Sequence, residues 1–347
     1  MLPDYSRQQS LKEIGAAGQA RLASSRVLVV GAGGLGSPVL QYLAGAGVGC
    51  IGIVDADVLD ASNLHRQPLY CLADVGRPKA ALAKAAVARL NPTVRVETHE
   101  VRFDADNAVE LVAAYDLVID CSDNFRTKFL VNDAAVLARK PAVFASVYQY
   151  EGQLQVYKPD AAHACLRCLW PDATADGIVG NCAEAGVLGP VPGAFGAMQA
   201  LLALKILIDI PGQLGGEMLL INFMNFTQLS LKAPRRAACG APACSVVRAP
   251  AREIPNIEIR LRSLGGAEAL GFEIIDIRNA DEVAVRPVEA RHIAMAALLA
   301  DPTALSTTKN YLLVCASGKR SAATARELST RGYSVKSLAG GLQSLES

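Results

Sequence analysis

The feature that most constrains this 347-residue chain is a glycine-rich motif directly behind a short apolar run. Residues Arg26–Val30 have the composition of a buried strand, and Gly31-Ala-Gly33-Gly34-Leu-Gly36 then fits the pattern G-x-G-x-x-G at the start of a predicted helix. Glycines let the backbone approach a phosphate at the positive end of a helix. Asp55 ends the next apolar run and can accept hydrogen bonds from ribose hydroxyls. Alone, these residues favour an NAD or FAD site.

Strands alternate with helices through the first part of the chain, which predicts a doubly wound, mostly parallel α/β sheet. After Arg26–Val30, the predicted strands are 50–54, 94–98, 116–120 and 141–147, and the helices between them lie near 34–46, 78–90 and 126–139. Residues 165–193 lack periodicity and are predicted to be loop-like. A buried helix is expected at 198–210, followed by strands at 219–226 and 228–231.

A second, smaller α/β pattern follows a segment that contains Pro250 and Pro255. It consists of predicted strands at 272–277, 311–315 and 334–338 with a helix at 321–331. We therefore predict two domains, at 1–247 and 257–347, joined by a linker at 248–256.

Composition and charge exclude several classes of protein. Hydrophobic residues make up 51% of the chain and charged residues 19%, which indicates packed cores. The formal net charge of +1 provides no overall field that would attract nucleic acid or an anionic membrane. No basic start followed by an apolar run marks a signal peptide, and glycines and prolines interrupt the uncharged stretch 185–204. We expect a cytoplasmic protein without a membrane segment.

Further polar segments shift the balance from NAD towards ATP. They are Ser62-Asn63-Leu64-His65-Arg66-Gln67, Lys79 behind Gly76-Arg77-Pro78, and Cys121-Ser122-Asp123-Asn124. In a doubly wound sheet, these segments fall at the strand ends where ligands bind. Release of pyrophosphate needs positive charge, which Arg66 and Lys79 would supply, while Asp123 could hold Mg²⁺. Each residue taken singly is also compatible with a solvated surface charge.

The nine cysteines suggest thiols and metal ligands in place of disulfides. Cys165 and Cys168 form one C-x-x-C pair, and Cys239 and Cys244 form a second pair with four residues between them. Four thiolates suit a closed tetrahedral Zn²⁺ site, although Cys165 and Cys168 could also be a redox pair. Cys50, Cys71 and Cys121 lie in or beside apolar runs, so we predict that they are core residues.

Taken together, the motifs resemble those of the molybdopterin-synthase and thiamine-pathway sulfur-carrier adenylyltransferases, relatives of the ubiquitin-activating enzymes. The resemblance runs from Tyr5-Ser6-Arg7-Gln8 to about Cys244. It rests on the segments Gly31–Gly36, Val54–Asp57, Ser62–Gln67, Val75–Lys79, Asp120–Asn124 and Glu184–Val187. The family's zinc site usually has two residues inside the second cysteine pair, where this chain has four.

The resemblance implies a role for each of these residues. Gly34 and its loop would contact ATP phosphates, Asp55 the ribose, Asn63 and Arg66 the phosphates, Lys79 the reacting phosphate region, and Asp123 the Mg²⁺. Arg7 would reach the ATP of a partner subunit, which implies a homodimer. Cys182 stands where thiamine-branch relatives carry a sulfur-handling cysteine, and an inert loop thiol is the alternative.

The second domain resembles a rhodanese domain in Asp276-Ile277-Arg278 and in Cys315-Ala-Ser-Gly-Lys-Arg320-Ser321. This loop lies between a predicted strand and a helix start, so backbone N–H groups would stabilise a persulfide anion on Cys315. The C-x4-R spacing favours sulfur, whereas the related phosphatase loop has C-x5-R. An inactive, degenerate domain is the alternative.

These expectations combine into one leading function. ATP and the C-terminal Gly-Gly carboxylate of a ubiquitin-like sulfur carrier would give an acyl-adenylate, and sulfur from a persulfide donor such as a cysteine desulfurase would convert it into a thiocarboxylate. The pathway, molybdenum cofactor or thiamine biosynthesis, stays open. The alternatives are an NAD-dependent oxidoreductase and a sulfur-binding scaffold that lacks adenylation.

Overall fold

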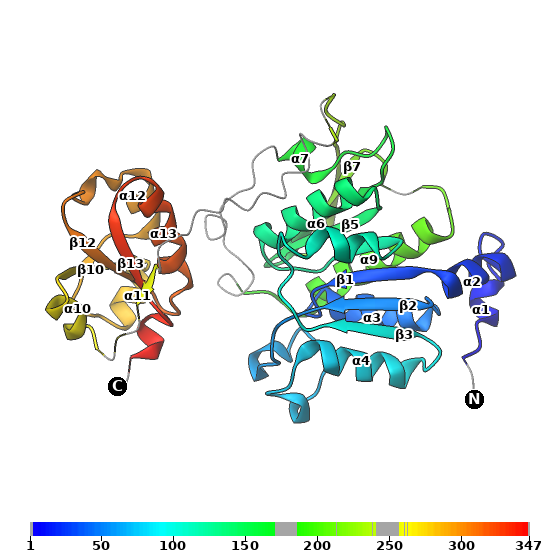
Figure 1. Cartoon of the computed structure of the whole chain (residues 1–347), viewed down its shortest axis with the longest axis horizontal. Helices are drawn as coiled ribbons and strands as arrows, with labels where there is room; N and C mark the ends of the chain where they lie inside the picture. The colour runs from blue at the N-terminus through cyan, green and yellow to red at the C-terminus, as the bar shows by residue number, and fades with distance from the viewer. Residues whose placement is uncertain are drawn as a thin grey trace. The chain divides into compact units, whose positions relative to one another are not determined.

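The computed structural model describes residues 3–170, 186–212, 214–237, 239–240, 257–259, 261 and 263–345. They form two compact units, one ending at residue 240 and one beginning at 257, which are described separately (Figure 1). The predicted linker 248–256 lies outside the described residues.

The first unit is built on an eight-stranded sheet in the order β3-β2-β1-β4-β5-β6-β7-β8. The parallel strands are β1 (Arg26–Val30), β2 (Cys50–Val54), β3 (Arg95–His99), β4 (Leu117–Asp120) and β5 (Ala142–Tyr148). An antiparallel extension adds β6 (Glu151–Tyr157), β7 (Glu217–Asn222) and β8 (Thr227–Lys232). The doubly wound fold predicted from the sequence is confirmed, but β6 was not among the predicted strands.

Both faces of the parallel strands are buried, as their nearly continuous apolar sequences require. On β1, Val27 and Val29 belong to one core and Leu28 and Val30 to the other. The first core includes residues of α3 (Gly36–Gly45), α4 (Lys79–Leu90) and α9 (Pro190–Leu207). The second includes residues of α5 (Ala108–Ala113) and α6 (Phe125–Ala138), so α4 and α6 cover opposite faces (Figure 1).

Shorter elements complete the first unit. They are α1 (Ser6–Gln9), α2 (Gly15–Ser24), α7 (Leu166–Leu169), and the 3₁₀ turns η1 (Ala61–Asn63) and η2 (Leu72–Asp74). The prediction of Cys71 as a core residue is wrong, since this thiol is exposed beside η2.

Helix α9 corrects the prediction of a loop that extends to residue 193. It begins at Pro190. Proline is compatible with a first helical turn because the N–H that it lacks would have no intrahelical acceptor there. Gly196 is needed inside it, since a Cβ there would lie 2.3 Å from the carbonyl oxygen of Leu35. By length and apolarity α9 could span a membrane, but half of it is buried in the unit, and Phe195 and Ala203 belong to the core.

The second unit is a five-stranded parallel sheet in the order β11-β10-β12-β13-β9. Its strands are β9 (Glu258–Ile259), β10 (Phe272–Asp276), β11 (Arg291–His292), β12 (Asn310–Val314) and β13 (Ser334–Leu338). Its helices are α10 (Gly265–Ala269), α11 (Ala280–Val285), α12 (Met295–Ala300) and α13 (Lys319–Thr330), with the 3₁₀ turns η3 (Pro302–Ala304) and η4 (Gly341–Ser344).

Candidate functional site

The glycine loop lies at the carboxyl edge of the sheet, where β1, β2 and β4 end together. Val30 is opposite Val54 on one side and Asp120 on the other, so the segments behind all three strands converge. Gly31 has a φ of 98°, and a Cβ there would lie 2.8 Å from the carbonyl oxygen of Cys121. Close packing of the β1 and β4 connections therefore requires glycine at the start of the loop.

Asp55 fastens this loop to the end of β2. Its Oδ2 accepts the N–H of Ala32 at 2.7 Å, and its Oδ1 accepts the N–H of Asp57 at 2.8 Å. Burial raises the pKa of the Asp55 carboxyl, while these two N–H groups partly oppose the shift. Tyr70 donates its hydroxyl to the carbonyl of Ala32 at 2.7 Å, which fixes the loop from the other side.

Lys79 begins α4 and is buried, with only 6% of its surface exposed. Its Nζ lies 3.0 Å from Oδ2 of Asp57, a carboxylate whose side chain is 73% exposed. The pair thus holds an ammonium group at the edge of the site, with its counter-charge facing solvent.

The segment Ser62–Gln67 forms a second wall of the site. The carbonyl of Arg66 lies 3.3 Å from a Cβ placed on Gly34, and the side chain of Arg66 contacts the carbonyl of Ser62 at 3.1 Å and the His65 ring at 2.8 Å. Asn63 completes a capping box with Asp60. Gln67 is buried, and its Oε1 has no hydrogen-bond partner in the part of the chain that the structure describes.

The third wall is the β4–α6 connection. Asp123 is exposed there, and Asn124 caps α6 by accepting the N–H of Thr127 at 2.8 Å. Behind it, the buried Lys128 forms an ion pair with the buried Asp120 and donates to the carbonyl of Ala145 at 2.6 Å. Motif analysis missed Lys128, because a lysine inside a helix gives no sign that it will be buried.

The residues at this edge fit a nucleoside triphosphate. Among the described residues, a Cβ on Gly33 would meet only Gln67 Nε2, at 3.5 Å, so this part of the structure leaves the loop backbone open to a ligand. The unpartnered Gln67 Oε1 is a buried polar atom that calls for a hydrogen-bond donor. Arg66 and Lys79 provide the positive charge, and the exposed Asp123 provides a carboxylate of the type that binds Mg²⁺. Gln67 belongs to the segment Ser62–Gln67, but the sequence did not predict it as a site residue.

Arg7 is not brought to this edge within its own chain. It is exposed on α1, whose Gln8 donates to the carbonyl of Ala46 at 3.1 Å. Ala46 caps the end of α3 that lies away from the glycine loop. A role for Arg7 at an ATP site would therefore need a second chain.

Three of the four predicted zinc ligands come together. Sγ of Cys165 lies 3.8 Å from Sγ of Cys168 and 3.7 Å from Sγ of Cys239, and the three sulfurs form one cluster. Burial opposes ionisation of Cys168, but hydrogen bonds such as the N–H of Arg236 lower the pKa of its thiol overall. Thiolates this close suit a soft tetrahedral metal ion. Cys244 and Cys182 lie outside the described residues.

In the second unit, Cys315 is fully buried between β12 and α13. Its Sγ accepts the N–H of Ser321 at 3.4 Å, and the Ser321 hydroxyl lies at the same distance. Gly341 closes against the loop, since a Cβ there would be 2.5 Å from the carbonyl oxygen of Cys315. One backbone N–H, that of Ser321, thus reaches the sulfur, and α13 begins at Lys319. Stabilisation of a persulfide anion on Cys315 stays a prediction.

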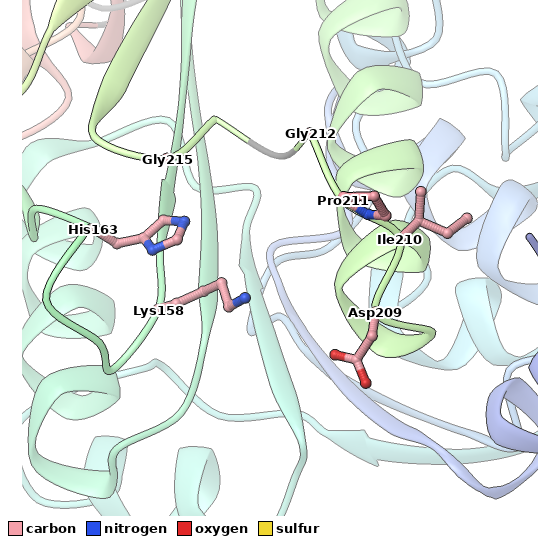
Figure 2. Close-up of a pocket in the computed structure, with 7 residues that line it drawn as sticks. All are labelled: Lys158, His163, Asp209, Ile210, Pro211, Gly212 and Gly215. Atoms are coloured by element: carbon pink, nitrogen blue, oxygen red, sulfur yellow. The ribbon is translucent and has the colours of Figure 1, made fainter.

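A separate hollow of about 270 Å³ lies at the opposite edge of the first sheet. Figure 2 shows Lys158 and His163 on one wall and Asp209, Ile210 and Pro211, which follow α9, on the other. Tyr157 pairs with Ala142, the first residue of β5, so this hollow is at the amino edge of the parallel strands. None of the predicted site residues lines it.

The fold and the site define a nucleotide-binding α/β protein with a cysteine-loop domain behind it. The ThiF family matches residues 5–244 and the rhodanese-like domain matches residues 261–347. The chain belongs to the ThiF family and carries a rhodanese-like domain. This confirms the resemblance seen in the sequence and removes the support for an NAD-dependent oxidoreductase.

Similar proteins include one named as an adenylyltransferase and one named as both an adenylyltransferase and a sulfurtransferase. "Sulfur carrier protein adenylyltransferase" of Thermus thermophilus is 48% identical over 246 residues, 69% of this chain and 91% of that protein. "Probable adenylyltransferase/sulfurtransferase MoeZ" of Mycobacterium tuberculosis is 46% identical over 226 residues, 64% of this chain but 58% of that protein. The structure of E. coli MccB with succinimide matches with a TM-score of 0.60 at 23% identity, over 68% of this chain and 73% of that one, which bears on the fold alone.

Proposed function

We propose that this protein adenylylates the C-terminal glycine carboxylate of a small ubiquitin-like sulfur carrier and then supplies sulfur to make a thiocarboxylate. The observation that carries the proposal is the convergence of an open glycine loop, the Lys79–Asp57 pair and Asp123 at one sheet edge. The names of the adenylyltransferase relatives support the reaction and the carrier. The ATP and Mg²⁺ requirements, a structural Zn²⁺ on the cysteines and a cytoplasmic homodimer belong to the same proposal.

In the first reaction, a carboxylate oxygen of the carrier attacks the α-phosphorus of ATP, and the bond to the β-phosphate oxygen breaks. The glycine loop and the N-terminus of α3 hold the phosphates, and Asp55 and Gln67 are our candidates for binding the nucleoside. Negative charge grows on the departing pyrophosphate, so Lys79 and Arg66 stabilise the transition state more than the ground state. Mg²⁺ held by Asp123 would neutralise further phosphate charge.

In the second reaction, Cys315 carries sulfur as a persulfide. Its terminal sulfur attacks the acyl carbon of the adenylate and displaces AMP, which leaves the carrier joined to Cys315 through an acyl disulfide. Attack by a second thiol on the S–S bond then releases the thiocarboxylate and leaves a disulfide. Cys182 is our candidate for that thiol on sequence grounds, with a cysteine desulfurase as the source of the persulfide.

The first prediction tests the nucleotide site through Asp123. Asp123→Asn removes one negative charge with little change in shape, and Asp123 is exposed, so the protein should fold normally. Without this carboxylate, Mg²⁺ binds weakly and carrier-dependent ATP–pyrophosphate exchange should fall by at least about 100-fold.

Asp116→Asn is the matched control for this prediction. Asp116 is also exposed and flanks the other end of β4, where it accepts the N–H of Arg26. Its exchange rate should equal that of the wild type. Full exchange in a folded Asp123→Asn protein would overturn the assignment of the site.

A further inference from the structure

The rhodanese-like unit has a cleft of about 350 Å³ beside the Cys315 loop. Ala316, the residue after the cysteine, forms part of its lining. The other lining residues come from Arg278, from α11 and its end, and from η4: Asp281, Glu282, Val285, Arg286, Leu342 and Gln343. Among the described side chains of this lining, two are cationic and two are acidic.

The arginine of the C-x4-R loop is held by one of these acidic residues. Arg320 forms two parallel contacts with Glu282, from Nη1 to Oε2 at 2.8 Å and from Nη2 to Oε1 at 2.5 Å. Arg320 is 18% and Glu282 31% exposed, so this pair is only partly screened by water. Arg278 is likewise engaged, with Nη2 2.6 Å from Oδ2 of the buried Asp276.

Arg278 and Arg320 thus have carboxylate partners, and the charge of Arg286 in the same lining is matched by that of Asp281, so these residues add no net positive charge to the cleft. This bears on which sulfur donor the cleft admits. Thiosulfate carries two negative charges and gains most where cations are uncompensated. A persulfide, R–S–SH, delivers the same sulfur atom with at most one charge. Glu282 neutralises Arg320, so the arginine of the C-x4-R loop adds no net positive charge to the cleft.

We propose that Glu282 is a specificity-determining residue, which acts through Arg320 to select low-charge persulfide donors and to disfavour thiosulfate. This inference rests on the proposed sulfur-transfer function. With a persulfide, the Cys315 thiolate attacks the outer sulfur, a new S–S bond forms, and R–S⁻ leaves. With thiosulfate, the same attack expels sulfite, so three negative charges must share the cleft during the reaction.

The test compares two donors on the full-length protein: thiosulfate and a persulfidated neutral peptide, acetyl-Gly-Cys-Gly-amide. Loading is read by mass spectrometry as one added sulfur atom on the Cys315 peptide. In Glu282→Gln, the ratio of the thiosulfate rate to the peptide rate should rise about tenfold, since one charge acts on a dianion across a partly hydrated cleft. Glutamine still accepts the N–H of Asn279, a bond that Glu282 makes at 3.1 Å, so α11 keeps its cap.

Glu273→Gln is the matched control. Glu273 is 32% exposed, lies near the start of β10, away from Asp276 and the cleft, and pairs with Arg291 and Lys309, so its loss should leave the donor ratio unchanged. Raising the ionic strength from about 0.05 M to about 0.5 M should speed thiosulfate loading of the wild type more than that of Glu282→Gln, where Arg320 is no longer neutralised. Asp281→Asn, at an exposed cleft position, should move the ratio in the same direction by less.

The outcomes separate this inference from the function on which it rests. An unchanged ratio in folded Glu282→Gln, or a wild type that loads faster from thiosulfate, overturns the role of Glu282 alone. If Cys315 of the wild type loads from neither donor, the wild type behaves as Cys315→Ala is expected to behave. The sulfur-transfer function itself then fails, and the inference fails with it.

Discussion

At the scale of single residues, Lys79 shows most directly how this site is built against local preference. A buried ammonium group is costly, and the first turn of a helix is the end where the macrodipole disfavours a cation. Asp57 offsets part of this cost with a contact of 3.0 Å. Such a violation of local rules is expected where function requires it, here the proposed binding of a polyanion.

The second prediction concerns this lysine. Lys79→Ala should lower kcat/KM for carrier adenylation by about 100-fold or more, because the charge that stabilises the departing pyrophosphate is lost. The loss should appear mainly in kcat, since the charge matters most in the transition state. Steady-state pyrophosphate release measures both constants.

Lys84→Ala provides the comparison, because Lys84 lies on the same helix but is exposed. It should retain wild-type kinetics. Equal, small losses in both variants would mean that Lys79 acts only through the general charge of the surface.

At the scale of elements, the segment Cys165–Cys168, which includes most of α7, is attached to α6. The N-terminus of α6 borders the candidate nucleotide site. Arg167, between Cys165 and Cys168, makes two bonds of 2.7 Å to Asp133, and Asn132 accepts the N–H of Leu166 at 2.7 Å. A metal ion that orders the cysteines would therefore also support α6.

The third prediction follows from this connection. Purified protein should contain about one Zn²⁺ per chain, and Cys239→Ser should lose it and melt at a lower temperature. Metal analysis together with thermal unfolding measures both effects. Cys71→Ser, which changes an exposed thiol, should alter neither the zinc content nor the Tm. Stable, metal-free Cys239→Ser protein would favour the redox interpretation of Cys165 and Cys168.

At the scale of the whole molecule, we propose that Arg7 links catalysis to assembly. The structure places Arg7 on α1 near the end of α3 that is remote from the glycine loop, so it does not serve the site of its own chain. Arg7 belongs to the motif Tyr5-Ser6-Arg7-Gln8. Its place in that motif would be explained by a homodimer in which each Arg7 completes the site of the other subunit.

The fourth prediction is complementation between two inactive variants. Arg7→Ala and Asp123→Asn should each lose adenylation, but unfolding and refolding them together should restore about a quarter of the wild-type activity. Half of the dimers are then mixed, and each mixed dimer has one intact site. Sedimentation would verify that dimers re-form. Mixtures that stay inactive although dimers form would show that Arg7 acts in cis or not at all.

The strands and the ligand-binding edge follow from local sequence. Arg26–Val30 and Cys50–Val54 were predicted with the bounds that the structure has, because strands buried on both faces are continuous apolar runs that end abruptly at polar or glycine residues. The glycine motif and the polar residues behind each strand follow from the same rule, since parallel strands bring their carboxyl ends to one edge.

Other features depended on contacts that sequence spacing does not encode. The close approach of Gly196 in α9 to Leu35 is a tertiary contact, and the burial of Lys128 depends on Asp120 and Ala145, which lie in different strands. The exposure of Cys71 likewise reflects where η2 lies on the surface.

The doubly wound fold, the proposed nucleotide edge and the cysteine loop could be predicted from the sequence, because periodicity and glycine placement act within a few residues along the chain. The pairing of charges could not, because it arises when distant segments pack together. Lys79 with Asp57 and Arg320 with Glu282 are separated by 22 and 38 positions. Ion pairing depends on distance through space, which the order of residues leaves open until the strands and helices have packed.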